Sequence, residues 1–243
     1  VVAVIGSGAP LQGAVQHHHL PVHPEHILVH GGDEGGGGNE TGPGTTYTFE
    51  AEGIDVTGLT GRGYSVSYSE TELIIGKETT SSIPDNVASS MSNGFCIAYW
   101  NTPDTTLTFK INADKASENN TITLRVSSEY GSLDVTKDAL SVIVNDTELD
   151  YDPFTIVGED LASVNDWHGL AVPFADYKIS ASFPLKEGEN VIKIRTNKNK
   201  LGFEEDAFLD SVSPDLDCIK IRSESNLTWD SMWDENKEQM GLD

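Results

Sequence analysis

The sequence has few positive charges: 15 lysines and arginines stand against 39 aspartates and glutamates, which gives a formal net charge of −24. A chain this acidic repels nucleic-acid phosphate and anionic lipid, so its charge argues against both as partners. Long apolar runs are also lacking, because none approaches the ~18–20 residues that a membrane-spanning helix needs. We therefore expect no nucleic-acid partner and no membrane span.

Cysteine is equally scarce, with only Cys96 and Cys218 in the chain. The pair permits one disulfide or two separate reduced thiols, and the sequence leaves both possibilities open. The alternation in LDCIKI places Ile219 and Ile221 on one face of a strand and Cys218 on the other. We therefore expect Cys218 to lie off the main core.

Catalytic motifs are missing as well. The chain has no G-x-S-x-G elbow and no H-E-x-x-H, and its glycine-rich run GGDEGGGG neither follows an expected strand nor opens a helix. A glycosidase needs two carboxylates that face each other across a cleft. The acidic run at 204–206 is more simply a solvated turn, and we expect no enzymatic activity.

The residues that are abundant indicate strands and turns. Thr, Ser, Val, Asn and Gly dominate, and segments such as TLTFKI and TITLRV alternate polar and apolar residues as half-buried strands do. No stretch of helical length shows a clear apolar period of 3.6 residues. Many short strands without helices between them predict an all-β sandwich or barrel. The expected strands are 47–52, 72–76, 94–100, 105–113, 121–130, 140–146, 176–185, 190–197 and 217–223.

Three zones follow from this pattern. Residues 1–46 form an extended N-terminal arm rich in His and Gly, residues 47–223 form one β domain, and residues 224–243 form an acidic tail. Trp229 and Trp233 are four residues apart, a spacing that would place both on one face of a short helix. A linker into a further domain is the alternative for this tail.

The expected strands, taken in order, resemble the jelly-roll carbohydrate-binding modules of families 6 and 35. A Glu-x-Glu strand in FEAE opens the match, GFCIAYW and TLTFKINA supply its middle, and GENVIKI and DCIKI close it, over about residues 47–222. The resemblance implies a jelly-roll β-sandwich of the galactose-binding-like class. It also implies a non-catalytic extracellular domain that binds a polysaccharide or another glycan.

A calcium site is the most specific expectation. Glu50 and Glu52 project to one side of a strand, and Asp217 joins them if the first and last strands lie side by side. Three carboxylates repel unless they are neutralised, and Ca²⁺ takes six to eight oxygen ligands. The alternative is a pair of solvated glutamates on an edge strand. The resemblance implies a structural Ca²⁺ at these positions, with further backbone ligands around Tyr68 to Glu72.

Sugar recognition needs flat aromatic faces with polar groups nearby. Trp100 in AYWNTPD and Trp167 in NDWHG are the candidates on expected loops. The related modules often have Asn just before the last strand, where this chain has Asp215. An ionised Asp only accepts hydrogen bonds, which alters that sugar contact. Trp100 as the continuation of a strand, and Trp167 as a plug under a long loop, are the structural alternatives.

Six of the seven histidines fall within residues 17–30. Within this cluster His23, His26 and His30 could gather Zn²⁺, Cu²⁺ or Ni²⁺ through neutral imidazoles. Pro21 and Pro24 oppose the helix that would align them. A polar linker without a specific metal, and an arm that packs or donates a strand, are the alternatives.

Location and assembly give the last expectations. Asn-x-Ser/Thr triplets at Asn39, Asn119, Asn145 and Asn226, together with the acidic composition, favour a secreted or surface glycoprotein. The β-prone run VVAVIG could add a strand to the sheet of a neighbouring copy. Head-to-tail donation of this kind builds a filament. A structural subunit of an extracellular filament is therefore the second hypothesis for the function.

Overall fold

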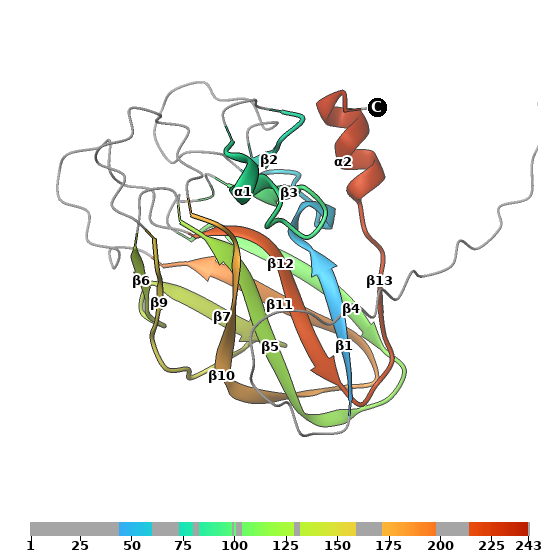
Figure 1. The fold of residues 1–243 in the computed structure, drawn as a ribbon. Helices are drawn as coiled ribbons and strands as arrows, with labels where there is room; N and C mark the ends of the chain where they lie inside the picture. Colours follow the sequence, from blue (N-terminus) through green and yellow to red (C-terminus); the bar gives the residue numbers. More distant parts are fainter. Residues whose placement is uncertain are drawn as a thin grey trace, which may run out of the picture. The chain divides into compact units, whose positions relative to one another are not determined.

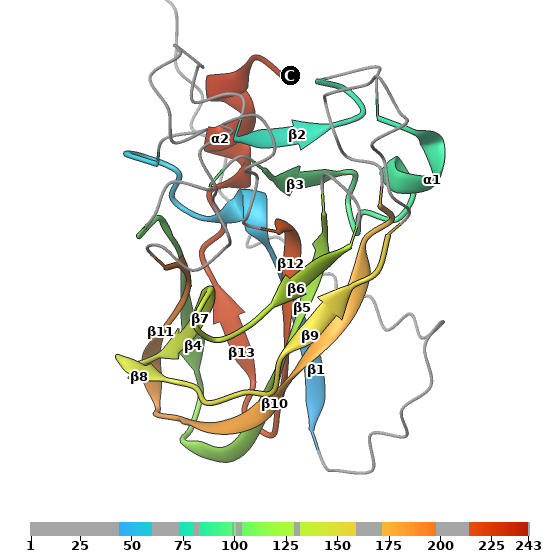
Figure 2. The same cartoon turned by 90° about the vertical axis from the view of Figure 1, so that its left-hand side faces the viewer.

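The computed structural model describes residues 44–59, 73–79, 83–98, 100, 104–128, 132–158, 172–197 and 214–242. Two antiparallel sheets face each other (Figures 1 and 2). In the six-stranded sheet the order is β10 (Ala175–Leu185), β5 (Ser117–Ser127), β12 (Asp215–Ser223), β3 (Phe95–Ile97) and β2 (Ile74–Gly76), and β1 (Thr45–Glu50) also pairs with β12. The five-stranded sheet has the order β13 (Leu227–Trp229), β4 (Thr106–Ala113), β11 (Gly188–Thr196), β7 (Leu140–Val144) and β8 (Thr147–Glu148).

Successive long strands alternate between the two sheets. The chain passes from β4 to β5, from β10 to β11, and from β12 to β13, and each step changes sheet. This connection pattern is that of a jelly roll, so the predicted all-β jelly-roll sandwich is confirmed. Apolar residues at alternate positions of these strands fill the space between the sheets, and Phe109, Ile122, Leu124, Ile192 and Ile194 are fully buried there.

Every run that the sequence marked as a strand contains one. The prediction missed β6 (Leu133–Val135) and β9 (Phe154–Ile156), which pair with each other, as well as β8, β13 and the short helix α1 (Asp85–Ala88). The other helix, α2 (Trp233–Met240), lies in the C-terminal segment, where a short helix was one of the alternatives. These elements are short and carry too few alternating positions to produce a pattern. No helix in the described ranges is long and apolar enough to cross a membrane.

The segment expected to be an acidic tail, with a short helix or a linker as its alternatives, contains the strand β13 and the helix α2. Trp229 belongs to β13, which pairs with β4 opposite Ile111, whereas Trp233 begins α2. The two indoles therefore do not share a helix face. Their four-residue spacing misled because an extended segment separates them, and because Trp229 packs against Phe49 and Phe109 in the core. Residues 224–242 thus belong to the sandwich; the arm up to residue 43 lies outside the described residues.

A bulge in β12 decides which side chains face outward. Leu216 stands opposite Val126 and Cys218 stands opposite Arg125, so Asp217 is an extra residue without a partner position on β5. Leu216 keeps its place in the core, while Asp217 turns to the outer face of the sheet together with Cys218. The bulge therefore removes a carboxylate from the core and presents it on the other side of the sheet.

Both cysteines are buried free thiols, so of the two possibilities that the sequence leaves open the structure has the reduced pair and not the Cys96–Cys218 bond. Cys218 does lie on the outer face, but it is 0% exposed. The physical reason is a second, smaller apolar cluster that covers this end of the sheet. Its members are Ile75, Ile83, Val87, Met91, Cys96, Ala98 and Phe174.

Candidate functional site

The first and last strands of the predicted domain lie side by side. β1 runs antiparallel to β12 from Thr45 opposite Ser223 to Glu50 opposite Cys218 (Figure 1). This pairing places Glu50 on the outer face, next to the bulge at Asp217. The arrangement that the calcium expectation required is therefore present in the backbone.

Glu52 reaches the same place by a different route from the one expected. The strand ends at Glu50, and residues Ala51–Gly53 form a single 3-10 turn, η1, in which Glu52 is fully buried. The Asn93 side-chain amide donates to Oε1 of Glu52. The other oxygen, Oε2, is buried without a hydrogen-bond partner. A buried carboxylate oxygen without a partner is costly, and it marks a place where a positive group would be stabilised.

Asp217 and Glu50 meet at Ser92. The backbone N–H of Ser92 lies 3.0 and 3.1 Å from the two carboxylate oxygens of Asp217, and its hydroxyl lies within hydrogen-bond distance of both Asp217 and Glu50. Arg125 Nε also lies 3.1 Å from Oδ2 of Asp217. One hydroxyl hydrogen cannot serve two carboxylates at once, so Ser92 leaves part of the negative charge unmatched.

The electrostatics of the three carboxylates reflect this crowding. Burial, followed by the charge of Glu50, raises the pKa of Glu52 from 4.5 to about 8. The same two causes, in the same order, raise the pKa of Asp217 from 3.8 to about 7, although Ser92 and Arg125 act against the rise. Burial also raises the pKa of Glu50. The charge of Glu50 therefore disfavours the ionisation of both Glu52 and Asp217, and the charge of Asp217 adds to the rise at Glu52.

The chemistry of the donors fits a hard cation. Glu50, Glu52, Asp217 and the Ser92 hydroxyl offer oxygen atoms, the ligands that Ca²⁺ prefers. The buried Oε2 of Glu52 lacks the partner that a cation would be. Within the ranges that the structure describes, no group of three or more His, Cys, Asp or Glu side chains is arranged so that it could hold a metal ion. The backbone ligands expected around residues 68–72 lie outside those ranges.

The expected sugar-binding residues that the structure describes, Trp100 and Asp215, are buried. Trp100 is 0% exposed and its indole N–H donates to the Pro214 carbonyl at 2.8 Å, so it is a core residue and offers no face to a sugar. Asp215 is 1% exposed at the start of β12 and is not a surface acceptor. Both predictions are corrected, because Trp100 is packed in the core after the end of β3 and Asp215 is covered within β12. Trp167 lies outside the described residues.

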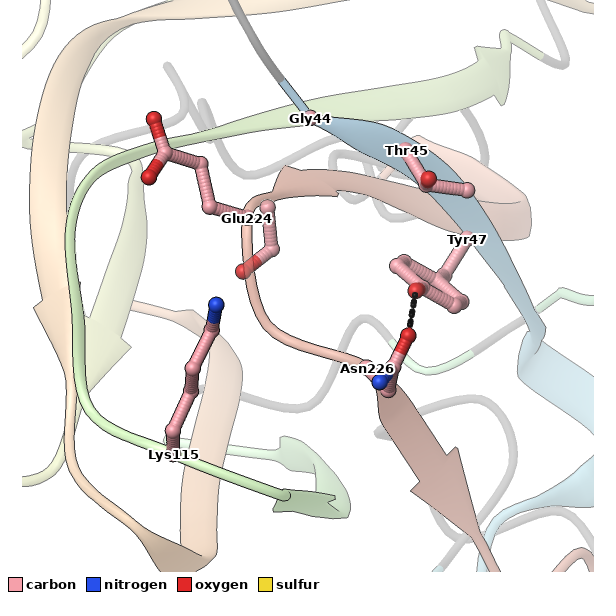
Figure 3. Close-up of a pocket in the computed structure, with 7 residues that line it drawn as sticks. Gly44, Thr45, Tyr47, Lys115, Glu224 and Asn226 are labelled. Carbon is pink, nitrogen blue, oxygen red and sulfur yellow. Dashed lines mark hydrogen bonds between the residues drawn. The ribbon is translucent and has the colours of Figure 1, made fainter.

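An open polar groove lies at the other end of β1. Figure 3 shows Tyr47, Lys115, Glu224 and Asn226 around it. The Tyr47 hydroxyl donates to Asn226 Oδ1 at 3.3 Å. An aromatic ring, an amine, a carboxylate and an amide are residue types that sugar sites use. Sequence reasoning missed this groove because its members come from three distant segments.

The remaining expectations concern modification and a second metal. Asn119 and Asn226 are exposed, and the side-chain amide of Asn226 donates to Asp114. Asn145 is only partly exposed, because its side-chain amide binds Asn190 and Val191 in a turn. Asn39 and the three histidines His23, His26 and His30 lie outside the described residues.

Three residues that contact the carboxylates or the backbone that carries them had no signal in the sequence. Ser92 and Asn93 lie in the loop SMSNG, and Asn236 lies in α2, where its side chain donates to the carbonyls of Glu52 and Ile54. Ser and Asn are common in loops for reasons of turn formation alone. Only the fold brings these residues to the carboxylates.

No family model matches the chain, and no curated protein matches it in sequence. Among solved structures it is similar to a family 35 carbohydrate-binding module from an environmental isolate, with 14% identity and a TM-score of 0.42 over 76% of this chain and 98% of that module. It is also similar to a family 35 module from Clostridium thermocellum, with 13% identity and a TM-score of 0.42 over 73% of this chain and 97% of that module.

The β-(1,4)-mannanase GH26-CBM35 of Podospora anserina is a third neighbour, with 16% identity and a TM-score of 0.40. This alignment covers 73% of the present chain but only 27% of the mannanase. The structural neighbours are thus carbohydrate-binding modules, or an enzyme that carries one, of the type that the sequence resembles. The likeness is distant in sequence and partial in structure.

Proposed function

We propose that this chain is a non-catalytic, extracellular carbohydrate-binding domain stabilised by calcium. The observation that carries the proposal is the convergence of Glu50, Glu52 and Asp217 where the first strand meets the last. These are the positions at which the ordered motifs of the sequence imply a structural cation. The jelly-roll fold and the lack of catalytic motifs support the same function.

Calcium would neutralise the three carboxylates and stabilise the folded domain. Glu50, Glu52 and Asp217 would hold it, with the buried Oε2 of Glu52 gaining the partner it lacks. The ion would join β1, η1 and β12, three segments that are remote in sequence. Anything that binds the folded chain but not the unfolded chain stabilises the fold.

The calcium part is tested by thermal unfolding and calorimetric titration of the full chain. We expect Ca²⁺ to raise the melting temperature relative to a sample in EGTA, and Mg²⁺ to do so less, because the site is an irregular set of oxygens. Glu52→Gln should remove most of the calcium effect. Glu187→Gln, at an exposed turn position, is the matched control and should keep it. A wild-type chain with equal melting temperatures in Ca²⁺ and EGTA contradicts the calcium proposal.

The glycan part is tested separately with a panel of neutral β-glycans and galactosides. A net charge of −24 disfavours acidic polysaccharides unless a cation bridges the two. Trp167→Ala tests the expected loop site, and Tyr47→Ala tests the groove of Figure 3. Loss of binding in one variant alone locates the site. No binding by the wild-type chain to any glycan of the panel in Ca²⁺ contradicts this part.

The filament is the second candidate function. β10 is an 11-residue strand at one end of the order of the six-stranded sheet and could receive a donated strand. Its pairing with β5 is irregular in two places, and it contains Pro184 and Lys178, features that disfavour strand addition. Size-exclusion chromatography with light scattering decides between the functions. We propose a monomer; polymers that disappear when residues 1–30 are deleted would support the filament.

A further inference from the structure

The C-terminal segment holds the turn that carries Glu52. Three successive carbonyl oxygens of this turn, those of Glu52, Gly53 and Ile54, all accept hydrogen bonds from residues after β13. Asn236 Nδ2 donates to Glu52 O at 2.7 Å and to Ile54 O at 2.9 Å, and the Met232 N–H donates to Gly53 O at 2.8 Å. Figures 1 and 2 show α2 beside the end of β1.

The burial of α2 is unusual for a helix that packs on a domain. Asn236 is its one buried residue, with 3% exposure, and the flanking residues Glu235 and Lys237 are exposed or partly exposed. A short helix normally buries apolar side chains. Here the buried side chain is an amide that uses both of its N–H groups on the turn. The Asn236 contact therefore specifies geometry, while the partly buried Trp233 and Met240 supply the apolar packing of α2 against the core.

The segment before α2 fits the turn as closely. A side chain on Gly53 would meet the Trp229 ring at 2.7 and 2.9 Å, so the backbone of the turn lies directly against β13 and the residues after it. Trp233 also packs on Phe95, with ring centroids 4.8 Å apart, next to the loop that supplies Asn93. The C-terminal segment thus contacts both the turn and the strand that follows the Ser92–Asn93 loop.

We propose that Asn236 is a positioning residue of the carboxylate site, which keeps Glu52 oriented toward Glu50 and Asp217. This inference rests on the proposed calcium site. If the packing of α2 on the turn favours cation binding by Glu52, then cation binding favours the packing of α2 by the same free energy. Calcium occupancy is in this way communicated to the C-terminal helix.

Calorimetric titration of the full chain with Ca²⁺ tests the proposal. We expect Asn236→Ala to weaken calcium binding about 10- to 100-fold, the range found when a residue that supports a metal ligand is removed. Asn236→Gln keeps the amide but displaces it, and should give a smaller loss while folding more readily. Glu235→Gln, exposed on the same helix, is the control and should bind as the wild type does.

Melting temperatures separate positioning from mere stabilisation. A positioning role shrinks the calcium-induced rise in melting temperature in Asn236→Ala. A purely structural role lowers the melting temperature equally in Ca²⁺ and EGTA and leaves the calcium affinity unchanged, which would overturn this inference alone. Failure of the wild-type chain to bind calcium would overturn the calcium proposal and this inference together.

Hydrogen exchange of the wild-type chain provides a test that needs no variant. The amides of Met232 and Asn236 are hydrogen-bonded to Gly53 O and Met232 O. We expect calcium to slow exchange in a peptide covering residues 230–242, while a peptide from β11, at the other sheet, stays unchanged. Calcium binding without any change in the C-terminal peptide would contradict the coupling.

Discussion

Trp229 occupies the space that any side chain on Gly53 would need. Two atoms of its ring lie 2.7 and 2.9 Å from the position of a Cβ at Gly53. This contact joins the turn η1 to the last strand, β13, two segments that are far apart in the sequence. It also shows that the glycine is required by close approach, and the indole is held from behind by Phe49 and Phe109.

Gly53→Ala should therefore destabilise the domain. The added methyl group forces Trp229 or the turn to move, and overpacking of this kind costs about 1–3 kcal/mol. For a domain of this size we expect the melting temperature to fall by ~2–12 °C. Differential scanning calorimetry measures it, with Thr228→Ala, exposed on the same strand, as the control. An unchanged melting temperature would mean that the turn adapts freely.

The carboxylate site predicts an unusual pH dependence for the metal-free chain. The folded pKa values of Glu52 and Asp217, about 8 and about 7, exceed their ordinary values of 4.5 and 3.8. The folded state then binds more protons than the unfolded state at neutral pH, and its stability falls as pH rises. In EGTA, we expect the contribution of these groups to the free energy of unfolding to be greatest below their ordinary pKa values of 3.8 and 4.5, to decline as the pH rises above them, and to be lost once the pH exceeds about 8.

Calcium should abolish this decrease, because the ion replaces the protons. Urea unfolding at several pH values, in EGTA and in Ca²⁺, provides the measurement. Glu52→Gln is neutral at every pH and should flatten the dependence in EGTA, whereas Glu187→Gln should leave it intact. A metal-free stability that rises between pH 6 and pH 8 would show that these carboxylates are ionised without strain in the folded state.

Trp100 should behave as a core residue and not as a sugar platform. Trp100→Phe removes the donor to the Pro214 carbonyl and leaves a small void, so we expect a loss of about 1–3 kcal/mol in the free energy of unfolding. Glycan affinity of the folded fraction should remain unchanged. Chemical denaturation and a binding titration on the same sample test both statements. Reduced affinity with unchanged stability would restore the surface role.

The thiols should be unreactive in the folded chain. Burial raises the pKa of the Cys218 thiol, and both cysteines are inaccessible to reagents. We expect no labelling by a thiol-specific dye under native conditions and labelling of two thiols in guanidinium chloride without a reducing agent. Mass spectrometry counts the labels. Labelling that requires prior reduction would show that the two cysteines form a disulfide after all.

The sequence was a reliable guide to the fold where strands are long. Alternation in TLTFKI and TITLRV shows one apolar face directly. The pairing of β1 with β12 meets the condition on which the expectation for Asp217 depends. Sequence reasoning failed for β13, because the spacing of Trp229 and Trp233 looked helical while the core contacts of Trp229 hold it in a strand. Tertiary packing decided that segment, not local preference.

The site was predictable only in part. Glu50, Glu52 and Asp217 could be named from the Glu-x-Glu motif and the last strand. Glu52 was expected on the same strand as Glu50, however, and instead lies in the 3-10 turn that follows this strand. Ser92 and Asn236 could not be found, because each is an ordinary polar residue whose partner is 42 or 184 positions away in the sequence. No local sequence pattern indicates such contacts. The regular alternation of β12 likewise gave no sign of its bulge.

That bulge has a consequence for anyone who transplants or redesigns this region. Deleting a single residue at 217–218 would restore uniform pairing with β5. Leu216 would then stay opposite Val126 in the interior. If the intact chain were instead paired regularly upstream of Ile219, Asp217 would enter the interior and Leu216 would turn to the outer face. Copying the three acidic residues onto an ideal β-ribbon would therefore not reproduce the arrangement, since the irregularity itself aims the last of them.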